Sequence, residues 1–320
     1  MAFLEIKGLE KEYKDFTLSL SMAIEEGEFI SIIGPSGSGK STMLSVIAGM
    51  LPPDRGQILL SGDDITGRRI QDRGIGMVFQ DIALFPSMNV KKNIQAGMKE
   101  KDRKKRNELT ERLLELVGLP GYGKRAISSL SGGEAQRVAL ARSIAAEPRI
   151  LLLDEPLSSL DAPLRKHLRA AIRMIHDSLG MTMLYVTHDR EEAFAVSDRI
   201  AIMHDGRIEA IGTAEELYRK PCNLFTAFFT GEGTAIPASV LSEGASGTLF
   251  FRPENAQIAD SDADSSSFPR HMIFRNAEIV SAEFTGDGYT LGLDWNGFQI
   301  LARSIIRPRK KDVSVIILKE

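Results

Sequence analysis

The apolar residues of this chain gather in short, nearly continuous runs that end at polar residues. Three such runs are Phe29 to Ile33, Ile150 to Leu153 and Thr182 to Val186. Continuous runs of this length are typical of strands that are covered on both faces, whereas half-exposed strands alternate. The pattern therefore predicts an open α/β structure whose parallel strands are buried.

Segments with helical spacing separate these runs. From residue 88 to residue 147 the apolar positions follow a helical period, and one apolar face stops at Gly118, as a helix end does. This stretch lies between a strand predicted at Gly76 to Phe79 and the run that begins at Ile150. We therefore expect a helical subdomain, at about residues 88–147, inserted into the α/β domain.

After Gly231 the pattern changes to short alternating segments punctuated by glycine and proline. Thr248 to Phe251, Ala277 to Val280 and Tyr289 to Leu293 are examples. Short strands at regular spacing predict a small all-β domain. We therefore expect an α/β domain over residues 1–230 and a β-rich domain over residues 231–320.

The composition is that of an ordinary globular protein and gives no sign of a nucleic-acid partner. The 320 residues are 43% hydrophobic and 26% charged, with a formal net charge of −3, so bulk nucleic-acid binding is not expected. The basic run from Lys99 to Arg106 is offset by Glu100, Asp102 and Glu108 and contains no aromatic residue. We interpret it as a solvated helix face and not as a nucleic-acid site.

The chain shows no feature expected of a membrane span or of an oxidising compartment. Cys222 is the single cysteine, so an intrachain disulfide is impossible and a reducing compartment is favoured. No apolar stretch approaches the roughly 20 residues that a span needs. Charged residues interrupt the first eleven positions, so no secretion signal is visible.

A glycine-rich loop follows the run that ends at Ile33. It fits the pattern G-x-x-x-x-G-K-[ST], and helical spacing follows it. Glycines let the backbone wrap around a polyphosphate and point N–H groups at it, and the helix N-terminus adds positive charge. Lys40 is predicted to reach the β- and γ-phosphates, and Ser41 to ligate Mg²⁺. The candidate nucleotide-binding residues here are Gly34, Pro35, Ser36, Gly37, Ser38, Gly39, Lys40, Ser41 and Thr42.

Polar residues at the ends of two other predicted strands are candidate catalytic groups. Asp154 and Glu155 end the run that begins at Ile150. An aspartate there suits an Mg²⁺ ligand, often through water, and the adjacent glutamate suits a general base for an attacking water. His188 follows the run that ends at Val186, at the edge where open α/β sheets bind ligands. A lone histidine is otherwise usually a surface residue.

Two further features are incomplete on their own. Ser131, Gly132 and Gly133 open a predicted helix and form a second anion-binding terminus, although one loop already holds the phosphates. Tyr13 lies in a polar link before a strand. It could stack on a nucleotide base or be an ordinary surface or core tyrosine.

Taken together, these motifs resemble the ATP-binding subunit of ABC transporters over residues 3 to about 230. The resemblance implies ATP and Mg²⁺ as cofactors, and a homodimer whose two copies face each other head to tail with ATP between them. The motifs occur in the family's order: the phosphate loop Gly34 to Thr42, the Q-loop glutamine Gln80, the signature Leu130-Ser-Gly-Gly-Glu-Ala-Gln, the strand ending in Asp154-Glu155, the D-loop Ser158 to Asp161 and the switch histidine His188.

The resemblance implies roles for residues around the nucleotide. Tyr13 would stack on adenine, and Thr42 would add phosphate contacts. Gln80 would touch Mg²⁺ and report to a membrane partner. Glu155 would polarise the attacking water, and His188 would hold the γ-phosphate.

Other roles follow from the head-to-tail dimer that the resemblance implies. Ser131, Gly132 and Gly133 would act in trans on the γ-phosphate held by the other copy, and Asp161 would link the two sites. Glu134 departs from the glutamine of many relatives. Its negative charge near a phosphate is unfavourable on Coulomb grounds.

The tail resembles the TOBE-type β-domain of importer ATPases through Phe251-Arg-Pro-Glu254. This implies a bacterial-type importer subunit, peripheral at the cytoplasmic face of the inner membrane. Its partners would be a transmembrane permease and, indirectly, an extracytoplasmic solute-binding protein. The segments His188 to Ala193, Phe229 to Gly233 and Ala235 to Ala238 look most like ferric-iron importers.

Other functions share parts of this pattern. Importers of polyamines, sugars, sulfate or other small solutes have the same motifs. A non-transport ABC ATPase acting on DNA or the ribosome typically carries tandem ATPase domains, long coiled coils or zinc modules, and none is visible in the sequence. In a transporter, the loop Ile82 to Pro86, with Val90, would shape the groove that receives the permease. A regulatory ligand site in the β-rich domain stays open.

Overall fold

The fold was analysed in a computed structural model that describes residues 2–158, 160–241, 244–260, 272–308 and 310–317. These residues form two units, one that ends at Leu217 and one that begins at Tyr218. The sequence pattern places the boundary later, at residue 230. The difference arises because α8 (Leu224–Thr230) is hydrogen-bonded to the β-rich part of the chain, as described below.

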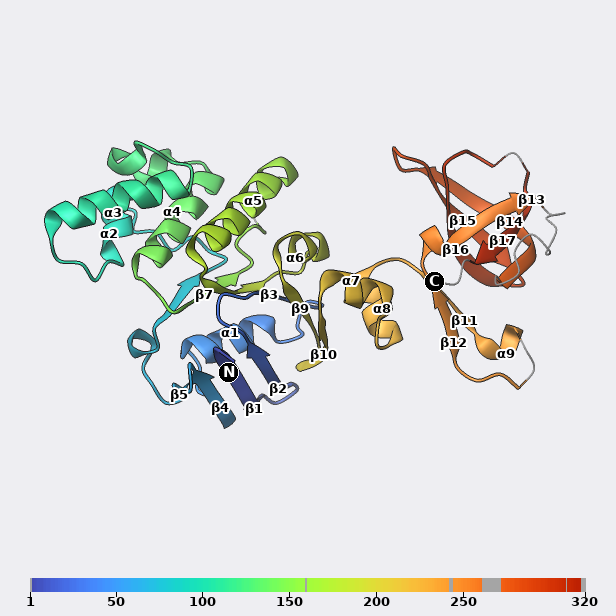
Figure 1. Cartoon of the computed structure of the whole chain (residues 1–320), viewed down its shortest axis with the longest axis horizontal. Helices are drawn as coiled ribbons and strands as arrows, with labels where there is room; N and C mark the ends of the chain where they lie inside the picture. The colour runs from blue at the N-terminus through green and yellow to red at the C-terminus, as the bar shows by residue number, and fades with distance from the viewer. Residues whose placement is uncertain (1, 159, 242–243, 261–271, 309, 318–320) are drawn as a thin grey trace. The chain divides into compact units, whose positions relative to one another are not determined.

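A six-stranded sheet forms the centre of the first unit (Figure 1). Its strand order is β10-β9-β3-β8-β7-β6, and all neighbours are parallel except β9 and β10. The runs at Phe29, Ile150 and Thr182 form three adjacent inner strands, as their continuous apolar character predicts. The strands are β3 (Phe29–Ile33), β6 (Ile75–Val78), β7 (Ile150–Asp154), β8 (Thr182–Val186), β9 (Arg199–His204) and β10 (Arg207–Gly212).

A second, antiparallel sheet with the order β2-β1-β4-β5 belongs to the same unit. In β2 the side chains of Leu18, Leu20 and Met22 are buried while their neighbours are more exposed, the pattern of a half-buried strand. The strands are β1 (Leu4–Glu12), β2 (Thr17–Ile24), β4 (Arg55–Leu60) and β5 (Asp63–Asp64).

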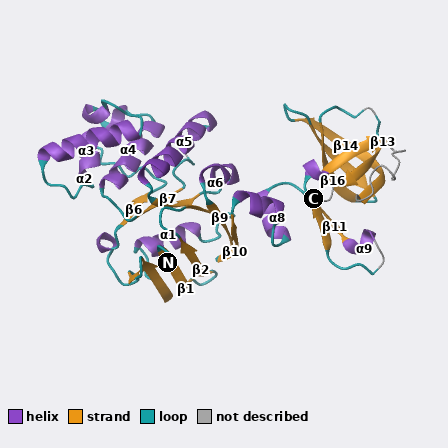
Figure 2. Cartoon of the chain, viewed as in Figure 1, coloured by secondary structure: helices purple, strands orange, loops and turns teal. Residues whose placement is uncertain are grey.

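Helices α2, α3 and α4 lie between β6 and β7 in the chain and gather apart from the sheets (Figure 2). They confirm the prediction of an inserted helical subdomain. None of the described helices is long and apolar enough to cross a membrane. The α-helices up to residue 219 are α1 (Lys40–Ala48), α2 (Val90–Ala96), α3 (Arg103–Leu116), α4 (Gly132–Ala145), α5 (Ala162–Leu179), α6 (Arg190–Val196) and α7 (Ala214–Arg219); short 3-10 turns span Ile70–Asp72, Tyr122–Lys124 and Ile127–Ser129.

The alternation of side chains along β7 decides where the site residues point. Ile150 and Leu152 belong to the core shared with α1 and the antiparallel sheet, whereas Leu151 and Leu153 belong to the core shared with α2 to α5. Successive side chains of a strand face opposite sides. Asp154 therefore continues the row of Ile150 and Leu152 and faces the side of α1.

The second unit is mainly antiparallel sheet, which confirms the prediction of a small all-β domain of the OB/TOBE type. Five strands pair in the order β13-β17-β14-β15-β16, and β11 and β12 form a separate hairpin. Alternating residues of these strands fill one apolar core. The elements are β11 (Thr234–Pro237), α9 (Ala238–Leu241), β12 (Thr248–Phe251), a 3-10 turn (Pro253–Asn255), β13 (Ala256–Asp260), β14 (Met272–Phe284), β15 (Tyr289–Trp295), β16 (Phe298–Ser304) and β17 (Asp312–Ile317).

The Arg-Pro-Glu motif connects α8 to this β-rich part. The Arg252 guanidinium is buried and donates to the carbonyl oxygens of Tyr218, Ala227 and Glu232 and to the hydroxyl of Thr230. The guanidinium carbon of Arg252 also lies over the Tyr218 ring, 4.1 Å from the ring centroid. A planar fork of donors suits such a buried junction, so the motif has a structural role here.

Candidate functional site

The glycine-rich loop joins β3 to α1 in a shape that needs its glycines. Gly37 and Gly39 have left-handed backbones, with φ of 81° and 98°. A Cβ at Gly39 would lie 2.6 Å from the Phe16 ring, and one at Gly34 would clash with the Met203 carbonyl oxygen. The loop can therefore fold tightly only with glycine at these positions.

A polar hollow of about 310 Å³ lies over this loop. The start of α1 and Glu155 both line this hollow. Free N–H groups and the helix dipole at the start of α1 favour an anion. The predicted residues Gly34, Pro35 and Ser38 support the loop from outside the lining, and the buried Ser38 hydroxyl has no hydrogen-bond partner within the described residues. The lining consists of Phe16, Ser36, Gly37, Gly39, Lys40, Ser41, Thr42 and Glu155.

Lys40 is held at the base of the hollow. Its side chain is buried, and Nζ donates to the carbonyl oxygens of Gly34 and Pro35 at 2.9 and 2.8 Å. Burial lowers the pKa of the ammonium, although the charges of Glu155 and Asp154 oppose this shift. An ammonium in this position gains from any anion that enters the hollow, because a phosphate is a stronger acceptor than a carbonyl.

Ser41 and Asp154 form a pair of oxygen donors beside Lys40. The Ser41 hydroxyl donates to Asp154 Oδ1 at 3.3 Å. Burial raises the pKa of Asp154, the Ser41 bond opposes the shift, and the charge of Glu155 adds to it. A hard divalent cation fits this donor set, since Mg²⁺ is commonly held by one carboxylate and by the phosphates of its substrate. The described residues contain no cluster of three His, Cys, Asp or Glu side chains suited to a metal.

Glu155 and His188 meet at the mouth of the hollow. His188 Nδ1 lies 2.9 Å from Glu155 Oε2. The Glu155 backbone has a φ of 43°, and its N–H donates to the Val186 carbonyl of the neighbouring strand. This left-handed conformation, uncommon for a residue with a side chain, turns the carboxylate from the end of β7 toward the hollow.

A buried network that the sequence analysis did not find supports the His188 loop. Glu192 is buried on α6 and accepts hydrogen bonds from the hydroxyls of Tyr185 and Thr187, each at 2.7 Å. Thr187 in turn accepts the Asp189 N–H. Burial and the charge of Glu192 raise the pKa of Tyr185 well above its usual value. The residues on both sides of His188 are thus fixed, which holds its ring near Glu155.

Two aromatic residues lie beside the phosphate loop. Tyr13 is 47% exposed, and its ring centroid is 6.3 Å from that of Phe16. Phe16 lines the hollow, whereas Tyr13 does not. Phe16 is not among the site residues that the sequence predicts. Its place in the site depends on contact with Gly39, which a local pattern does not reveal.

The signature residues lie outside the hollow of their own chain. Ser131 caps α4, and with Glu134 it forms a reciprocal capping box. Ser131 N–H donates to Glu134 Oε2 at 2.8 Å, and the Tyr122 hydroxyl donates to Glu134 Oε1 at 2.8 Å. The S-x-x-E spacing of a capping box is visible in the sequence. Ser131 and Gly132 are exposed, whereas Gly133 is buried against Leu164.

Two other predicted residues also lie outside the lining. Asp161 caps α5 by accepting the Leu164 N–H at 2.9 Å. Gln80 is exposed in the loop after β6. The D-loop position 159 lies outside the described residues.

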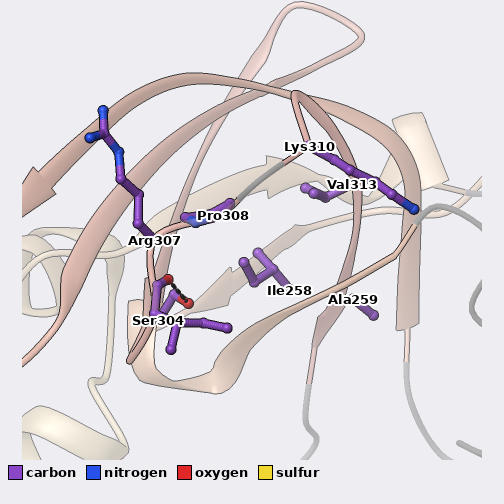
Figure 3. Close-up of a pocket in the computed structure, with 8 residues that line it drawn as sticks. Ile258, Ala259, Ser304, Arg307, Pro308, Lys310 and Val313 are labelled. Carbon is purple, nitrogen blue, oxygen red and sulfur yellow. Dashed lines mark hydrogen bonds between the residues drawn. The ribbon is translucent and has the colours of Figure 1, made fainter.

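The β-rich unit has a separate hollow of about 440 Å³ (Figure 3). Apolar side chains such as Ile258 and Val313 line it together with the exposed cations Arg307 and Lys310. The Ser304 hydroxyl donates to the Ile306 carbonyl at 2.7 Å. Among the described residues that line it, none is an acid or a histidine.

Known proteins similar to this chain share nearly its whole length. Residues 18–158 match the family model described as ABC transporter. The Fe(3+) ions import ATP-binding protein FbpC 1 of Pectobacterium atrosepticum is 39% identical over 313 residues, which cover 94% of this chain and 89% of the relative. The sulfate/thiosulfate import ATP-binding protein CysA of Caulobacter vibrioides is 42% identical over 317 residues, covering 90% and 91%.

Solved structures agree with this assignment. A dimeric ATP-binding cassette in a post-hydrolysis state with ADP and phosphate aligns with a TM-score of 0.58 at 29% identity, covering 66% of this chain and 98% of that chain. The cbiO1 protein of Clostridium perfringens, part of an ABC transporter complex, aligns with a TM-score of 0.64 at 29% identity, covering 68% and 91%. The chain therefore belongs to the ABC transporter family, among the ATP-binding subunits of importers.

Proposed function

We propose that this chain hydrolyses ATP to drive the import of ferric iron through a partner permease. The observation that carries the ATPase assignment is the Glu155 carboxylate, which lines the hollow over the phosphate loop while His188 holds its other side. A carboxylate there can reach a water beside the terminal phosphate.

The proposed nucleotide site uses the residues that converge on the hollow. Backbone N–H groups of the loop Gly34 to Thr42, except at Pro35, which has none, and the Lys40 ammonium hold the phosphates. Phe16 and Tyr13 provide aromatic surfaces for adenine. Ser41, Asp154 and Gln80 would hold Mg²⁺, which when bound neutralises charge that develops on the phosphate oxygens. The pairing of Ser41 with the buried Asp154 supports this choice.

In the proposed hydrolysis step, Glu155 takes a proton from the attacking water. The water oxygen bonds to the γ-phosphorus as the bond to the β–γ bridging oxygen breaks, which yields ADP and phosphate. His188 donates from Nδ1 to Glu155 Oε2, which orients the carboxylate. Its other ring nitrogen, Nε2, would donate to the γ-phosphate only in the form of the ring that carries a proton on both nitrogens. The Lys40 ammonium lies beside the phosphates and stabilises the charge that develops as ADP leaves.

We propose further that two copies close head to tail on two ATP molecules. Ser131 and Gly132 are exposed at the start of α4 and do not line their own hollow. They can therefore serve the ATP held by a partner copy, with Gly133 giving the close approach and Asp161 linking the two sites. The dimeric cassette among the similar structures supports this arrangement.

The loop after β6 is the proposed contact with the permease at the cytoplasmic face of the inner membrane. Phe85 is 46% exposed, and the fully buried Asn93 binds both its N–H and its carbonyl oxygen. Arg142 donates to Ala83 O and lies 5.5 Å from the Phe85 ring. Val90, expected to shape the groove, is fully buried. It would shape the groove only by packing beneath the residues that form its surface.

The choice of ferric iron rests on residues 229–238, because relatives of both kinds match both units: the sulfate importer subunit of Caulobacter vibrioides also covers 90% of this chain. The iron importer subunit of Pectobacterium atrosepticum covers 94% of this chain, and residues 229–238 resemble that group. Sulfate is the second candidate, because the sulfate importer subunit of Synechocystis is 46% identical over 236 residues. An extracytoplasmic solute-binding protein would supply the selectivity in either case.

The test of the substrate is uptake of radiolabelled solutes in cells that lack this chain. We expect ferric-iron accumulation to be lost and restored by the wild-type gene, while sulfate, polyamine and sugar uptake persist. Normal iron accumulation with loss of sulfate uptake would overturn the iron assignment and leave the ATPase mechanism in place.

A further inference from the structure

The helical subdomain contains a cationic pocket that has no part in the nucleotide site. It is formed by residues of α2 and α3 and the segments before them, and it has a volume of about 380 Å³. Within the described part of the chain, no acidic residue lines it. The lining combines cations with side-chain amides: Asn89, Lys91, Lys92, Gln95, Lys101, Arg103, Arg106 and Asn107.

The cations of this region outnumber the acids beside them and form no ion pair with them. Residues 91–106 include eight lysines and arginines but only two acids, Glu100 and Asp102. Both carboxylates accept backbone N–H groups at the start of α3. No ion pair in the described part of the chain involves any of the eight cations.

The cations do not stabilise the helix that carries them. The first turn of α3 begins at Arg103 and contains no acid, although a helix N-terminus favours negative charge. Charges that oppose the local preference of a helix, without an ion pair in return, indicate a role in binding.

Part of the pocket wall is fixed by hydrogen bonds between α2 and α3. Arg106 Nη2 donates to the Gln95 carbonyl oxygen at 2.9 Å. The Gln95 amide donates to Asn107 at 3.2 Å and to the fully buried Thr110 at 3.1 Å. Lys92, Lys101 and Arg103 are exposed at the rim. The pocket thus has an ordered wall and an exposed rim of positive charge.

We propose that this pocket binds the phosphate group of an anionic phospholipid at the membrane surface. Ammonium, guanidinium and amide donors around one concavity suit a phosphate group. The pocket residues Lys91 and Lys92 share α2 with Asn93, which holds Phe85 in the loop that meets the permease. The choice of a lipid over a free phosphate compound rests on the proposed function, in which this loop contacts a membrane permease. The inference of an anion site does not rest on that function.

Vesicle co-sedimentation of the full-length chain tests the proposal. The wild-type chain should bind phosphatidylcholine vesicles that contain phosphatidylglycerol, bind pure phosphatidylcholine much less, and dissociate as salt rises. Each cation at the surface contributes about fivefold to the partition coefficient, so Lys92→Glu/Arg103→Glu should weaken binding by at least about 25-fold. Glutamate suits the first turn of a helix, so this variant should retain its circular dichroism spectrum and melting temperature.

The matched control is Lys166→Glu/Arg207→Glu, which changes the net charge equally by replacing exposed cations outside the pocket. This control variant should bind the vesicles as the wild type does, apart from the effect of its changed net charge. Equal losses in both double variants, or a wild-type chain indifferent to phosphatidylglycerol, would overturn the proposal.

Two further arms separate the alternatives. Displacement of vesicles by millimolar glycerol phosphate at constant ionic strength would assign the pocket to a free phosphate compound and overturn the lipid source. If Lys92→Glu/Arg103→Glu assembles less well with the permease but binds vesicles as the wild type does, the lipid proposal is overturned. The pocket would then bind an acidic protein surface. ATP hydrolysis is measured on the same preparations, because its absence in the wild type would count against the proposed function and leave the vesicle result standing.

Discussion

Replacing Glu134 by glutamine isolates the charge of a side chain whose two oxygens are both engaged. Oε2 accepts the Ser131 N–H, and Oε1 accepts the Tyr122 hydroxyl. Glutamine can keep both contacts, with its carbonyl toward Ser131 and its amide group toward the Tyr122 oxygen. The variant therefore removes a charge from the start of α4 without removing hydrogen bonds.

The expected loss of stability follows from these two contacts. A hydrogen bond to a charged group contributes about 1.5–3 kcal/mol and a neutral one about 0.5–1.5 kcal/mol. Glu134 is half-buried, so solvent screens part of this difference. We expect Glu134→Gln to lower the free energy of unfolding by about 1–2 kcal/mol at pH 7, which corresponds to a fall of about 2–8 °C in Tm for a unit of this size.

The pH dependence provides the sharper test. The Ser131 N–H and then the Tyr122 hydroxyl lower the pKa of Glu134. Its contribution is therefore complete above the unfolded-state pKa of about 4.3 and is lost as the pH falls through the lower folded-state pKa. Thermal unfolding followed by circular dichroism should show a stability gap between wild type and Glu134→Gln that is full at pH 7 and narrows below about pH 4.

Tyr122→Phe is the matched control, since it removes one contact and keeps the charge. If Glu134 also faces the partner's γ-phosphate, Glu134→Gln should dimerise more tightly with ATP even though the monomer is less stable. An unchanged Tm at pH 7, or a stability gap that persists undiminished into the acid range, would refute the reasoning.

Three other substitutions test the nucleotide site and the dimer. Ser131→Arg should leave ATP binding by the monomer nearly unchanged and abolish ATP-driven dimerisation, because the signature serves the other copy; dimers of the variant in light scattering would count against the head-to-tail arrangement. Phe16→Ala should weaken ATP affinity by about tenfold, as loss of one aromatic platform does, and Tyr13→Ala by a similar amount. Equilibrium titration with a fluorescent ATP analogue measures both, and wild-type affinity in the two variants would exclude adenine stacking at this surface.

The elements best predicted from sequence are those specified by local pattern. The runs at Phe29, Ile150 and Thr182 form β3, β7 and β8 because each can be buried on both faces. The tail was predicted as an all-β domain from its regular short strands. Pairings between distant strands, such as β1 with β4, were not predicted, since they depend on contacts that no local period encodes.

The candidate site also contains residues that a local motif predicts and residues whose place depends on contacts between distant segments. Lys40, Ser41 and Glu155 converge on one hollow, and each belongs to a motif of fixed spacing. Phe16 and the buried Glu192 network were missed, because their contacts form only after distant segments pack together. The capping box of Ser131 and Glu134 follows from the S-x-x-E spacing, which is a local pattern.

The most direct test of the central claim is ATP turnover by the purified Glu155→Gln chain in the presence of Mg²⁺. Glutamine keeps the size of the side chain and its contact with His188, but it cannot accept a proton from water. The account predicts turnover reduced by roughly 10²-fold or more, with ATP still bound in a stable dimer. Glu191→Gln, which neutralises an exposed carboxylate on α6, should keep wild-type turnover. Near-normal hydrolysis by Glu155→Gln would contradict the assignment of Glu155 as the base.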